Sequence, residues 1–331
     1  YGIEFIAIGM ILGKVGFGFI DPLNVPAFKP LLLLGLSWAG LLFGLQFKYK
    51  RLTLLPLDSY KVAVISAVLV IISVFFVMFL INFILLPSPT FGESLGFALA
   101  LGACASVSSS AIVTSVVRQL KSRGFATRLL RVISALDGGG GLVFMAATIA
   151  VTKYFTDSSF AGPIWLLASL FLGGFLGFLF SLLLKMPMVA DQRLAMAAGM
   201  IIFASGASYY LHVSPLFVSA IAGVVLANTS DRADDFYRLL SGGETALYGV
   251  FLMIAAASWV WDGVGMAIAI ALFIGIRVCS KVVSVDFALK WSDAVPRYRW
   301  MGLGLTGIGG LALLLAFDIS CSFLQLCQEN C

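Results

Sequence analysis

Long apolar runs recur from one end of this chain to the other, and most are long enough to cross a lipid bilayer as a helix. A bilayer core needs about 20 apolar residues per helix. Strands are excluded because the runs are too long and do not alternate apolar with polar residues. The pattern predicts an all-α polytopic membrane protein with about eleven transmembrane helices. The predicted spans are 2–20, 30–47, 62–86, 92–117, 128–153, 162–185, 194–211, 214–229, 243–261, 263–290 and 297–319.

The composition leaves no room for a soluble domain. Apolar residues make up 61% of the 331 residues and charged residues only 11%, whereas a soluble domain carries roughly 25% charged residues. We therefore expect a single membrane domain over residues 1–331, with apolar side chains facing the lipid bilayer. The net charge of +5 does not indicate nucleic-acid binding, because the basic residues lie in short loops and form no continuous stripe.

The basic residues are distributed unequally between the two sides of the membrane. If the helices alternate in direction, loops on one side hold most of the 21 Lys and Arg residues, and the other side holds only Lys14, Lys29 and Lys153. The richer side is predicted to be cytoplasmic. The first residues include Glu4 and lack the basic start and cleavage site of a signal peptide. We expect a multi-pass protein of the cell (inner or plasma) membrane, with a cytoplasmic N-terminus and the C-terminus outside.

No motif in the sequence indicates an enzyme. There is no P-loop and no HExxH, and no His or Cys stands beside an acid at one depth of the membrane. We predict no cofactor, and any transport would draw its energy from an ion gradient or from the solute itself. Near the C-terminus, Cys321, Cys327 and Cys331 match no metal motif, and they would form a disulfide only if the tail faces an oxidising compartment.

Asp137 is the acid that stands out, since most others lie at helix ends or in loops. It is placed about ten residues into the run 128–153, near the bilayer midplane, and the glycines 138–141 follow it directly. A carboxylate at that depth costs at least a few kcal/mol, and intramembrane acids commonly mark ion pathways. The glycines would make room for water, an ion or another backbone. The simpler interpretation is a structural pair between Asp137 and a buried cation.

Arg277 and Lys281 are the candidate charge partners of Asp137. Both lie inside the run 263–290, one helical turn apart and on the same face. A lysine this close to the interface can extend its ammonium to water, which favours a plain structural interpretation of Lys281. For Arg277 a structural and a functional role stay equally open, because a buried charge needs a partner in either case.

Two of the predicted helices carry polar or Gly-rich interruptions at mid-membrane. The first is Cys104 to Ser110 and the second is Gly302 to Gly310. Transporters built from inverted repeats use such broken helices, whose free backbone groups bind the ion. The alternative is close packing of small residues between intact helices. Two interruptions, placed symmetrically and in opposite orientations, favour a broken pair.

Four stretches together resemble the membrane domain of monovalent cation:proton antiporters of the Kef and cation:proton antiporter-2 type. The likeness covers nearly the whole chain. The stretches are "GIEFIAIGMILG" (2–13), "SVSSSAIVTSVVRQLKSRG" (106–124), "RVISALDGGGGLVFMAATIAV" (131–151) and "VSPLFVSAIAGVVLAN" (213–228).

The resemblance implies a core domain that moves against a dimerisation domain, with an ion site at two crossed, broken helices. The core helices would lie within about 62–153 and 263–319, and the protein would be a homodimer. Asp137 would carry either a proton or, transiently, Na⁺ or K⁺, with Arg277 near the place where electrogenic members have a lysine. The other implied ion-binding residues are Ser108, Ser109, Ser110 and Thr306, and the implied conformational glycines are Gly138, Gly139, Gly307, Gly309 and Gly310.

The chain departs from the family pattern at three points. Leu136 stands where the family has Asn, Asp or Gln, which removes a polar ligand and leaves the identity of the cation open. Arg277 cannot release a proton, so exchange is expected to be electroneutral if Asp137 is the only proton carrier. The family's first and last helices are also not recognised here, nor is a Kef-type cytoplasmic domain.

The preferred function is a secondary antiporter that exchanges a monovalent cation, Na⁺ or K⁺, for protons by alternating access. Two alternatives stay open. One is a gradient-driven anion symporter on a similar inverted-repeat fold, which Arg277 and the Gly-rich stretches would suit. The other is a non-transporting membrane sensor or subunit, in which Asp137 and Arg277 form a structural pair.

Overall fold

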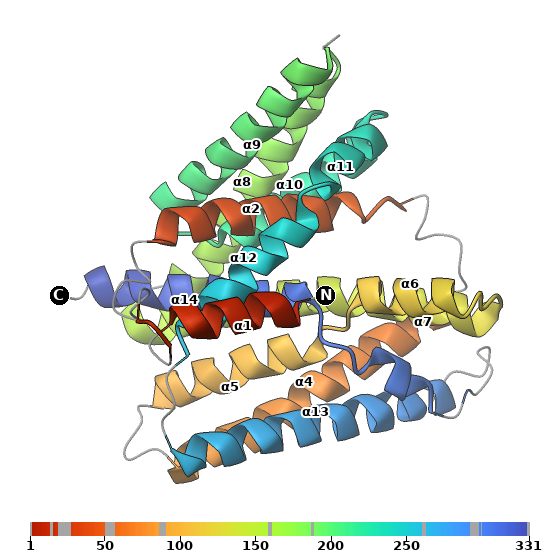
Figure 1. The fold of residues 1–331 in the computed structure, drawn as a ribbon, viewed down its shortest axis with the longest axis vertical. Coiled ribbons are helices and arrows are strands. Elements are labelled where there is room, and N and C mark those ends of the chain that lie inside the picture. Colours follow the sequence, from red (N-terminus) through yellow and green to blue (C-terminus); the bar gives the residue numbers. More distant parts are fainter. Residues whose placement is uncertain are drawn as a thin grey trace. The chain divides into compact units, whose positions relative to one another are not determined.

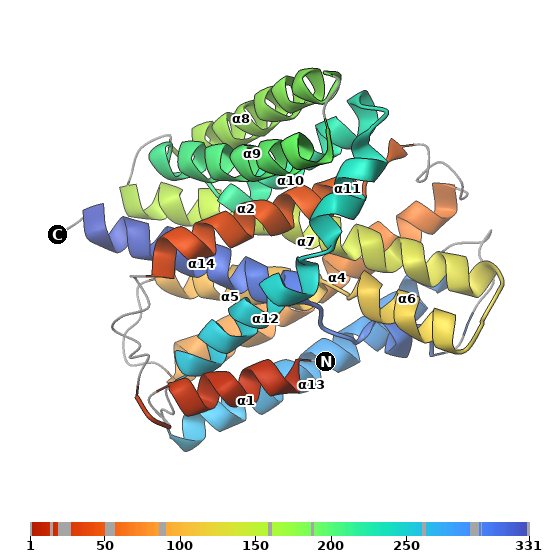
Figure 2. The same ribbon diagram turned by 45° about the horizontal axis from the view of Figure 1, so that its top comes forward.

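The structure is a computed structural model that describes residues 2–13, 16–18, 28–49, 57–85, 91–157, 161–186, 189–259, 263–291, 298 and 300–329. Its described residues form helices and their connections, as the apolar runs predict (Figures 1 and 2). The helices are α1 (Ile3–Leu12), α2 (Lys29–Leu45), α4 (Leu57–Leu85), α5 (Phe91–Ser106), α6 (Ser110–Gln119), α7 (Phe125–Asp157), α8 (Ala161–Leu184), α9 (Ala190–Tyr210), α10 (Pro215–Thr229), α11 (Ala233–Ser241), α12 (Glu244–Ala257), α13 (Val264–Lys290), a 3₁₀ turn (Met301–Leu305) and α14 (Gly310–Glu329).

Several of these helices are long and apolar enough to cross a membrane. By length and composition, 5 spans in the described residues pass, or up to 6 if the bent pair α11–α12, with its 47° angle, counts as one. Shorter apolar helices add to these: α1, α2, α10 and the Gly310–Cys321 part of α14. The protein is thus a multi-pass α-helical membrane protein. The predicted number of about eleven crossings is not confirmed by this criterion and stays a prediction.

Both predicted interruptions are real breaks in the helices. The first run divides into α5 and α6, and Val107 to Ser109 between them are not helical. The second divides into the 3₁₀ turn and α14, with Thr306 to Gly309 between them. In contrast, α7 runs unbroken for 33 residues through the glycines beside Asp137. The interpretation as intact helices packed through small residues is therefore wrong for the two interruptions.

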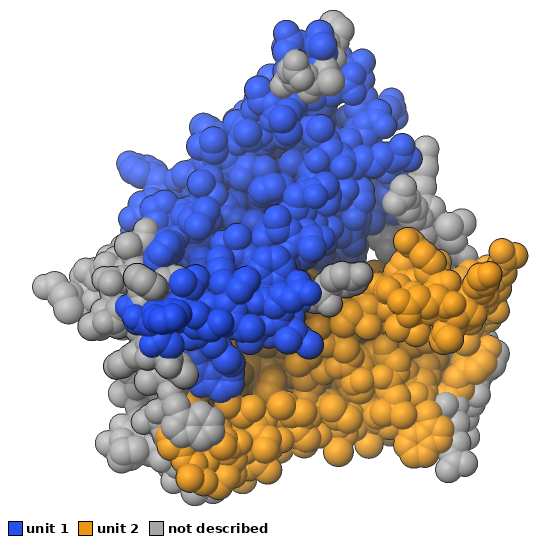
Figure 3. Space-filling model, viewed as in Figure 1, with its two compact units in different colours: residues 1–51, 164–261, 317–331 blue, residues 52–163, 262–316 orange. Residues whose placement is uncertain are grey.

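The chain folds into two compact units, shown in Figure 3. Unit 1 comprises residues 1–51, 164–261 and 317–331, and unit 2 comprises residues 52–163 and 262–316. In unit 1, α2 and α10 pack closely because Gly40 and Gly44 of α2 face the backbone of α10. Small residues of this kind let two helix backbones approach in a membrane protein. Gly40 and Gly44 therefore have a packing role between α2 and α10.

Unit 2 is built around α4, which contacts α5, α7 and α13. Its apolar core includes Val62 of α4, Leu129 and Ile133 of α7, and Val285 of α13, all of them fully buried. The 3₁₀ turn packs on α13 and contributes Leu305 to the same core. This arrangement brings both helix breaks, α7 and α13 together within one unit.

Candidate functional site

Asp137 lies fully buried in unit 2 and forms an ion pair with Lys281. The Lys281 Nζ lies 2.6 Å from Asp137 Oδ2, and both side chains have 0% exposure. The interpretation that Lys281 extends to the membrane interface is therefore wrong. Lys281 points into the core because a buried carboxylate without a counter-charge would be costly. The position of Lys281 along α13 does not predict that its side chain reaches Asp137 of α7.

Arg277 is hydrogen-bonded to the two helix breaks, whereas no hydrogen bond in the described structure joins it to the Asp137 carboxylate. Its Nη2 donates to the carbonyl oxygen of Val107 at 2.9 Å, and its Nη1 donates to the carbonyl oxygen of Thr306. These carbonyls belong to the first and the second break. A planar guanidinium suits this task because its donors form a rigid fork. The hydrogen bonds of Arg277 in the described structure thus do not support a direct structural pair between Arg277 and Asp137.

The two breaks also contact each other through the backbone. The Ser109 N–H donates to the carbonyl oxygen of Gly307 at 3.0 Å. Gly309 lies so close to Ser109 that a Cβ on the glycine would be 2.8 Å from the serine Oγ. The breaks therefore cross at a contact that requires a glycine, and the predicted pair of broken, crossing helices is confirmed.

Carbonyl groups freed at the breaks find donors inside the site. The Lys281 Nζ donates to Ser106 O at 2.8 Å, in addition to its contact with Asp137. The Ser108 hydroxyl lies 2.7 Å from Asp137 Oδ2 and 3.0 Å from Leu305 O. A hydroxyl has a single proton, so Ser108 serves one of these two acceptors at a time. The Asp137 Oδ1 atom, by contrast, is buried and has no hydrogen-bond partner among the described residues.

The remaining predicted ligands lie around this centre with other roles. The Ser109 hydroxyl caps α6 by accepting from the Ile112 N–H at 3.2 Å. Ser110 begins α6, and no hydrogen bond in the described structure joins it to Asp137. The Thr306 hydroxyl bonds back to Leu303 O at 2.8 Å, so Thr306 reaches the site through its carbonyl group. Of the predicted hydroxyls, Ser108 alone is hydrogen-bonded to Asp137 in the described structure.

The predicted glycines divide into two groups. Gly138 and Gly139 continue the unbroken helix α7, while Gly307 and Gly309 lie in the second break and Gly310 begins α14. Close to Asp137, Gly141 packs against Val107 and Ser106, where a Cβ would collide with the Val107 side chain. Because Gly141 has no side chain, the first break can pack against α7 close to Asp137.

Comparison with known proteins identifies the family. Residues 3–324 match the family "sodium/hydrogen exchanger, transmembrane". The chain belongs to this family. A curated relative, "Iron transporter MagA" of Paramagnetospirillum magneticum (strain ATCC 700264 / AMB-1), is 25% identical over 327 residues, which are 95% of this chain and 71% of the relative.

A solved structure supports the fold. The sodium proton antiporter MjNhaP1 of Methanocaldococcus jannaschii aligns with a TM-score of 0.64 and 15% identity, over 98% of this chain and 90% of that one. The protein is therefore a membrane antiporter of cations and protons by family, with an antiporter fold, and its family is one of transporters rather than enzymes. The family match does not specify the Kef-type subgroup.

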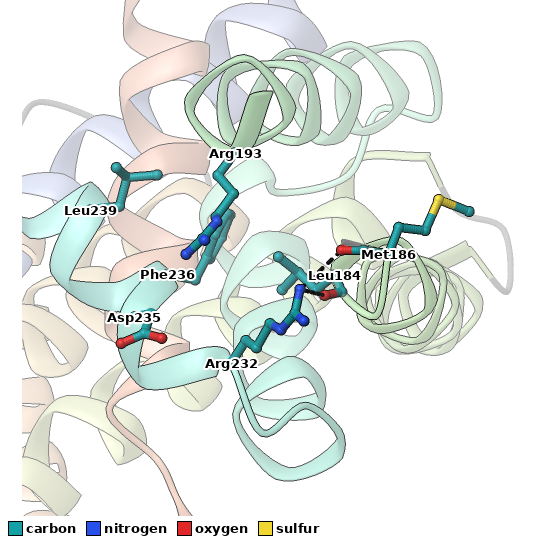
Figure 4. A pocket seen from close by; sticks show the side chains of 7 residues that line it. All are labelled: Leu184, Met186, Arg193, Arg232, Asp235, Phe236 and Leu239. Carbon is teal, nitrogen blue, oxygen red and sulfur yellow. Dashed lines mark hydrogen bonds between the residues drawn. The ribbon is translucent and has the colours of Figure 1, made fainter. Parts of the chain in front are cut away.

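This member of the sodium/hydrogen exchanger family has a small pocket in unit 1 (Figure 4). It is a cavity of about 80 Å³ where Arg193, Arg232 and Asp235 meet apolar side chains. The Arg232 Nη1 donates to Leu184 O at 3.3 Å and to Met186 O at 2.9 Å. These are carbonyls at the end of α8, so Arg232 caps that helix. These contacts give Arg232 a structural role at the C-terminal end of α8.

The described part of the chain offers no ready-made metal site beside the carboxylate. The described residues contain no group of three or more His, Cys, Asp and Glu side chains that could hold a metal ion. Cys104, Cys279 and Cys321 are free thiols, while the Cys327 side chain and Cys331 lie outside the described residues. A cation at this site would depend on Asp137 and the oxygens around it.

Proposed function

We propose that the protein exchanges a monovalent cation, Na⁺ or K⁺, for protons by alternating access, with Asp137 as the carrier of either ion. The observation that carries the proposal is a fully buried carboxylate at the crossing of two helix breaks, paired with the Lys281 ammonium at 2.6 Å. Buried charges deep in a membrane protein are costly and are kept where ions pass. The family and fold of the chain support the same activity.

A cation would have to compete with Lys281 for the carboxylate. The carbonyls of Ser106, Val107 and Thr306 already accept from the two cationic side chains. The buried acceptor left open at the centre is Asp137 Oδ1. We therefore propose that the cation displaces the Lys281 ammonium from Asp137. The Ser108 hydroxyl then turns its proton to Leu305 O and offers its own oxygen to the cation.

The position of Lys281 identifies a second group that can carry the proton. From the sequence, electroneutral exchange is expected if Asp137 is the only proton carrier, because Arg277 cannot lose its proton. A lysine ammonium can release a proton when it is buried and loses its partner. Asp137 is already a carboxylate in this ion pair, so the entry of one cation releases one proton, the one on Lys281. We propose electroneutral exchange of one cation for one proton, which a membrane potential alone does not drive.

Several finer assignments belong to the same proposal. Unit 2 would be the moving core, since it holds Asp137, Lys281, Arg277 and both breaks. Unit 1 would be the scaffold and the dimer contact. The subgroup would be the Kef and cation:proton antiporter-2 type, which four stretches of the sequence resemble. The orientation would be the one with a cytoplasmic N-terminus, which the distribution of basic residues favours.

A second candidate substrate comes from the curated relative, which is named an iron transporter. That protein aligns with 95% of this chain at 25% identity, so Fe²⁺ belongs among the cations to test. The anion symporter is disfavoured by the match to a cation exchanger family. In the non-transporting alternative, Asp137 and its cation would only stabilise the fold.

The deciding experiment is proton flux in proteoliposomes. Protein reconstituted with a pH-sensitive dye inside receives pulses of Na⁺, K⁺, Li⁺ or Fe²⁺, and an imposed potential in a separate trial. The variants are Asp137→Asn and, as a matched control, Asp286→Asn, whose side chain is 42% exposed and pairs with Lys290 at 3.4 Å.

We expect flux with Na⁺ or K⁺ in the wild type and in Asp286→Asn, and background flux in Asp137→Asn, because the carrier is gone. An imposed potential without a cation gradient should drive no flux in the wild type. Folded wild-type protein that gives no flux with any cation would refute the proposal and support the non-transporting alternative. Flux with Fe²⁺ and with none of the other cations would mean that the substrate is Fe²⁺ and not Na⁺ or K⁺.

A further inference from the structure

The first part of α14 is fixed to the ion site. This helix starts at the second break, where Gly309 packs against Ser109. Three residues further on, the Ala312 carbonyl oxygen accepts from the Cys104 Sγ of α5 at 3.7 Å. Each of these residues belongs to unit 2. A change in the geometry of the second break must therefore displace the start of α14.

The second part of the same helix is fixed within unit 1 by two different contacts. The Phe317 ring meets the buried ring of Phe251 in α12 edge-on, with centroids 5.2 Å apart. Next to it, Asp318 is 2% exposed and its Oδ2 accepts from the Ser214 hydroxyl at 2.6 Å. All of these residues belong to unit 1.

The boundary between the two units thus falls inside α14, between Ala316 and Phe317. The chain passes between the units at three other places. Two of them, after residues 51 and 261, lie outside the described residues, and the third is in the first turn of α8. Among the described crossings, α14 is the one where an unbroken helix extends well into each unit.

Asp318 is a costly residue to use for packing alone. A buried carboxylate is unfavourable unless hydrogen bonds satisfy it, and the structure supplies them from the start of α10. The Ser214 hydroxyl donates to Asp318 and accepts from the Phe217 N–H at 3.0 Å. The positive end of a helix also stabilises an acid. Since α10 packs tightly on α2 through glycines, this contact ties α14 to a firm part of unit 1.

We propose that Asp318 is a positioning residue that anchors α14 to the start of α10, so that a rearrangement at the second break is carried into unit 1. This inference rests on the proposed alternating access, which requires the two units to respond to one another. Its role is mechanical, and it acts through the helix rather than on the ion.

The first test needs no transport. Gly309→Ala disturbs the second break directly, because its Cβ would lie 2.8 Å from Ser109 Oγ. Hydrogen exchange is then followed by mass spectrometry in peptides covering residues 213–218 of unit 1. The backgrounds are wild type, Asp318→Asn and Ser214→Ala. The control background is Ser219→Ala, a buried serine of α10 whose hydroxyl has no partner among the described residues.

In the wild-type and Ser219→Ala backgrounds, we expect Gly309→Ala to raise hydrogen exchange at residues 213–218. In the Asp318→Asn and Ser214→Ala backgrounds, the same substitution should cause little further rise in hydrogen exchange. No response in the wild-type background would overturn the proposal. A response of equal size in the Asp318→Asn background would overturn it as well, since the signal would then travel by another route.

The second test uses the proteoliposome assay. Asp318→Asn should lower the maximal exchange rate and leave the apparent KM for the cation unchanged, whereas Ser214→Thr, which keeps the hydroxyl, should retain the wild-type rate. An unchanged maximal rate in Asp318→Asn would contradict the anchor. A wild type without flux would refute the proposed antiport instead, and the hydrogen-exchange result would then decide on the anchor.

Discussion

The two fully buried aspartates of the described structure, Asp137 and Asp318, are balanced in different ways. Each accepts a short hydrogen bond from a serine hydroxyl that precedes a helix, Ser108 for the first and Ser214 for the second. Asp137 also faces a lysine ammonium at 2.6 Å. The contacts described for Asp318 come from the start of α10, which is a fixed part of the backbone. A side-chain cation can move or lose its proton, while a helix terminus can do neither.

The comparison suggests how one type of residue serves two purposes. A carrier needs a counter-charge that an incoming ion can displace, and Lys281 meets that need. An anchor needs partners that stay in place, which Ser214 and the first turn of α10 provide. The predictions below compare the Lys281 contact of Asp137 with the Ser214 contact of Asp318.

The largest effect is expected when the counter-charge of Asp137 is removed. Lys281→Met leaves a buried carboxylate without its ion-pair partner, which costs about 3–5 kcal/mol of unfolding free energy. Ser214→Ala removes one hydrogen bond from Asp318 and should cost about 1–3 kcal/mol. Thermal or denaturant unfolding in detergent measures both.

Lys290→Met serves as the control on α13, because the Lys290 side chain is 52% exposed and pairs with Asp286 at the surface. Exposed pairs of this kind contribute about 0–1 kcal/mol. Equal losses of unfolding free energy in Lys281→Met and Ser214→Ala would contradict the comparison. The Lys281 ammonium would then stabilise Asp137 no more than the Ser214 hydroxyl stabilises Asp318.

An intermediate effect is expected at the fork that joins the two breaks. Arg277→Lys keeps the positive charge but cannot reach the carbonyls of both Val107 and Thr306. One buried acceptor is left without a donor, at a cost of about 1–3 kcal/mol. The same unfolding measurement detects the loss. The exposed Arg238 of α11 offers a matched Arg→Lys control, and wild-type stability in Arg277→Lys would mean that charge, not fork geometry, holds the crossing.

The smallest effect is expected from neighbouring serines with different tasks. Ser108→Ala removes a hydroxyl from Asp137 and should weaken cation binding by about 1 kcal/mol, which is about a fivefold rise in KM. Ser109→Ala removes the α6 cap and should cost about 1 kcal/mol of stability with KM unchanged. Flux against cation concentration, together with unfolding, separates the two. A KM that shifts equally in both variants would argue against the assigned roles.

Features set by local sequence were predictable here. Long apolar runs predict membrane helices, and the small and hydroxyl-bearing stretches marked both breaks. The depth of Asp137 within its run also predicted a buried carboxylate. Each of these depends on residues close together in the chain, where spacing is enough to decide.

Contacts between distant residues were not predictable in the same way. Lys281 and Asp137 are 144 positions apart, and Arg277 and Val107 are 170 apart. Spacing along α13 places Arg277 and Lys281 on one face but does not say which of them reaches the carboxylate. Backbone carbonyls are also present at every residue, so the sequence does not reveal which of them a break exposes.

One helix was missed although its signal was present. The predicted spans 214–229 and 243–261 leave no helix between them, yet α11 occupies Ala233–Ser241, with Asp234 and Asp235 in its first turn. Its buried residues Ala233, Phe236 and Leu240 recur at the spacing of one helical face. The charged residues of this segment hide that pattern from a search for long apolar runs.

The hydrogen bond between Ser109 N–H and Gly307 O has a consequence for how this protein can change over time. Both of its atoms belong to the main chain, so exchanging one side chain for another does not delete the bond itself. The scaffold of the crossing is in that sense insulated from point mutations that would remove a side-chain contact. Ion preference can drift as the surrounding side chains are replaced, while the frame that presents them to the ion persists.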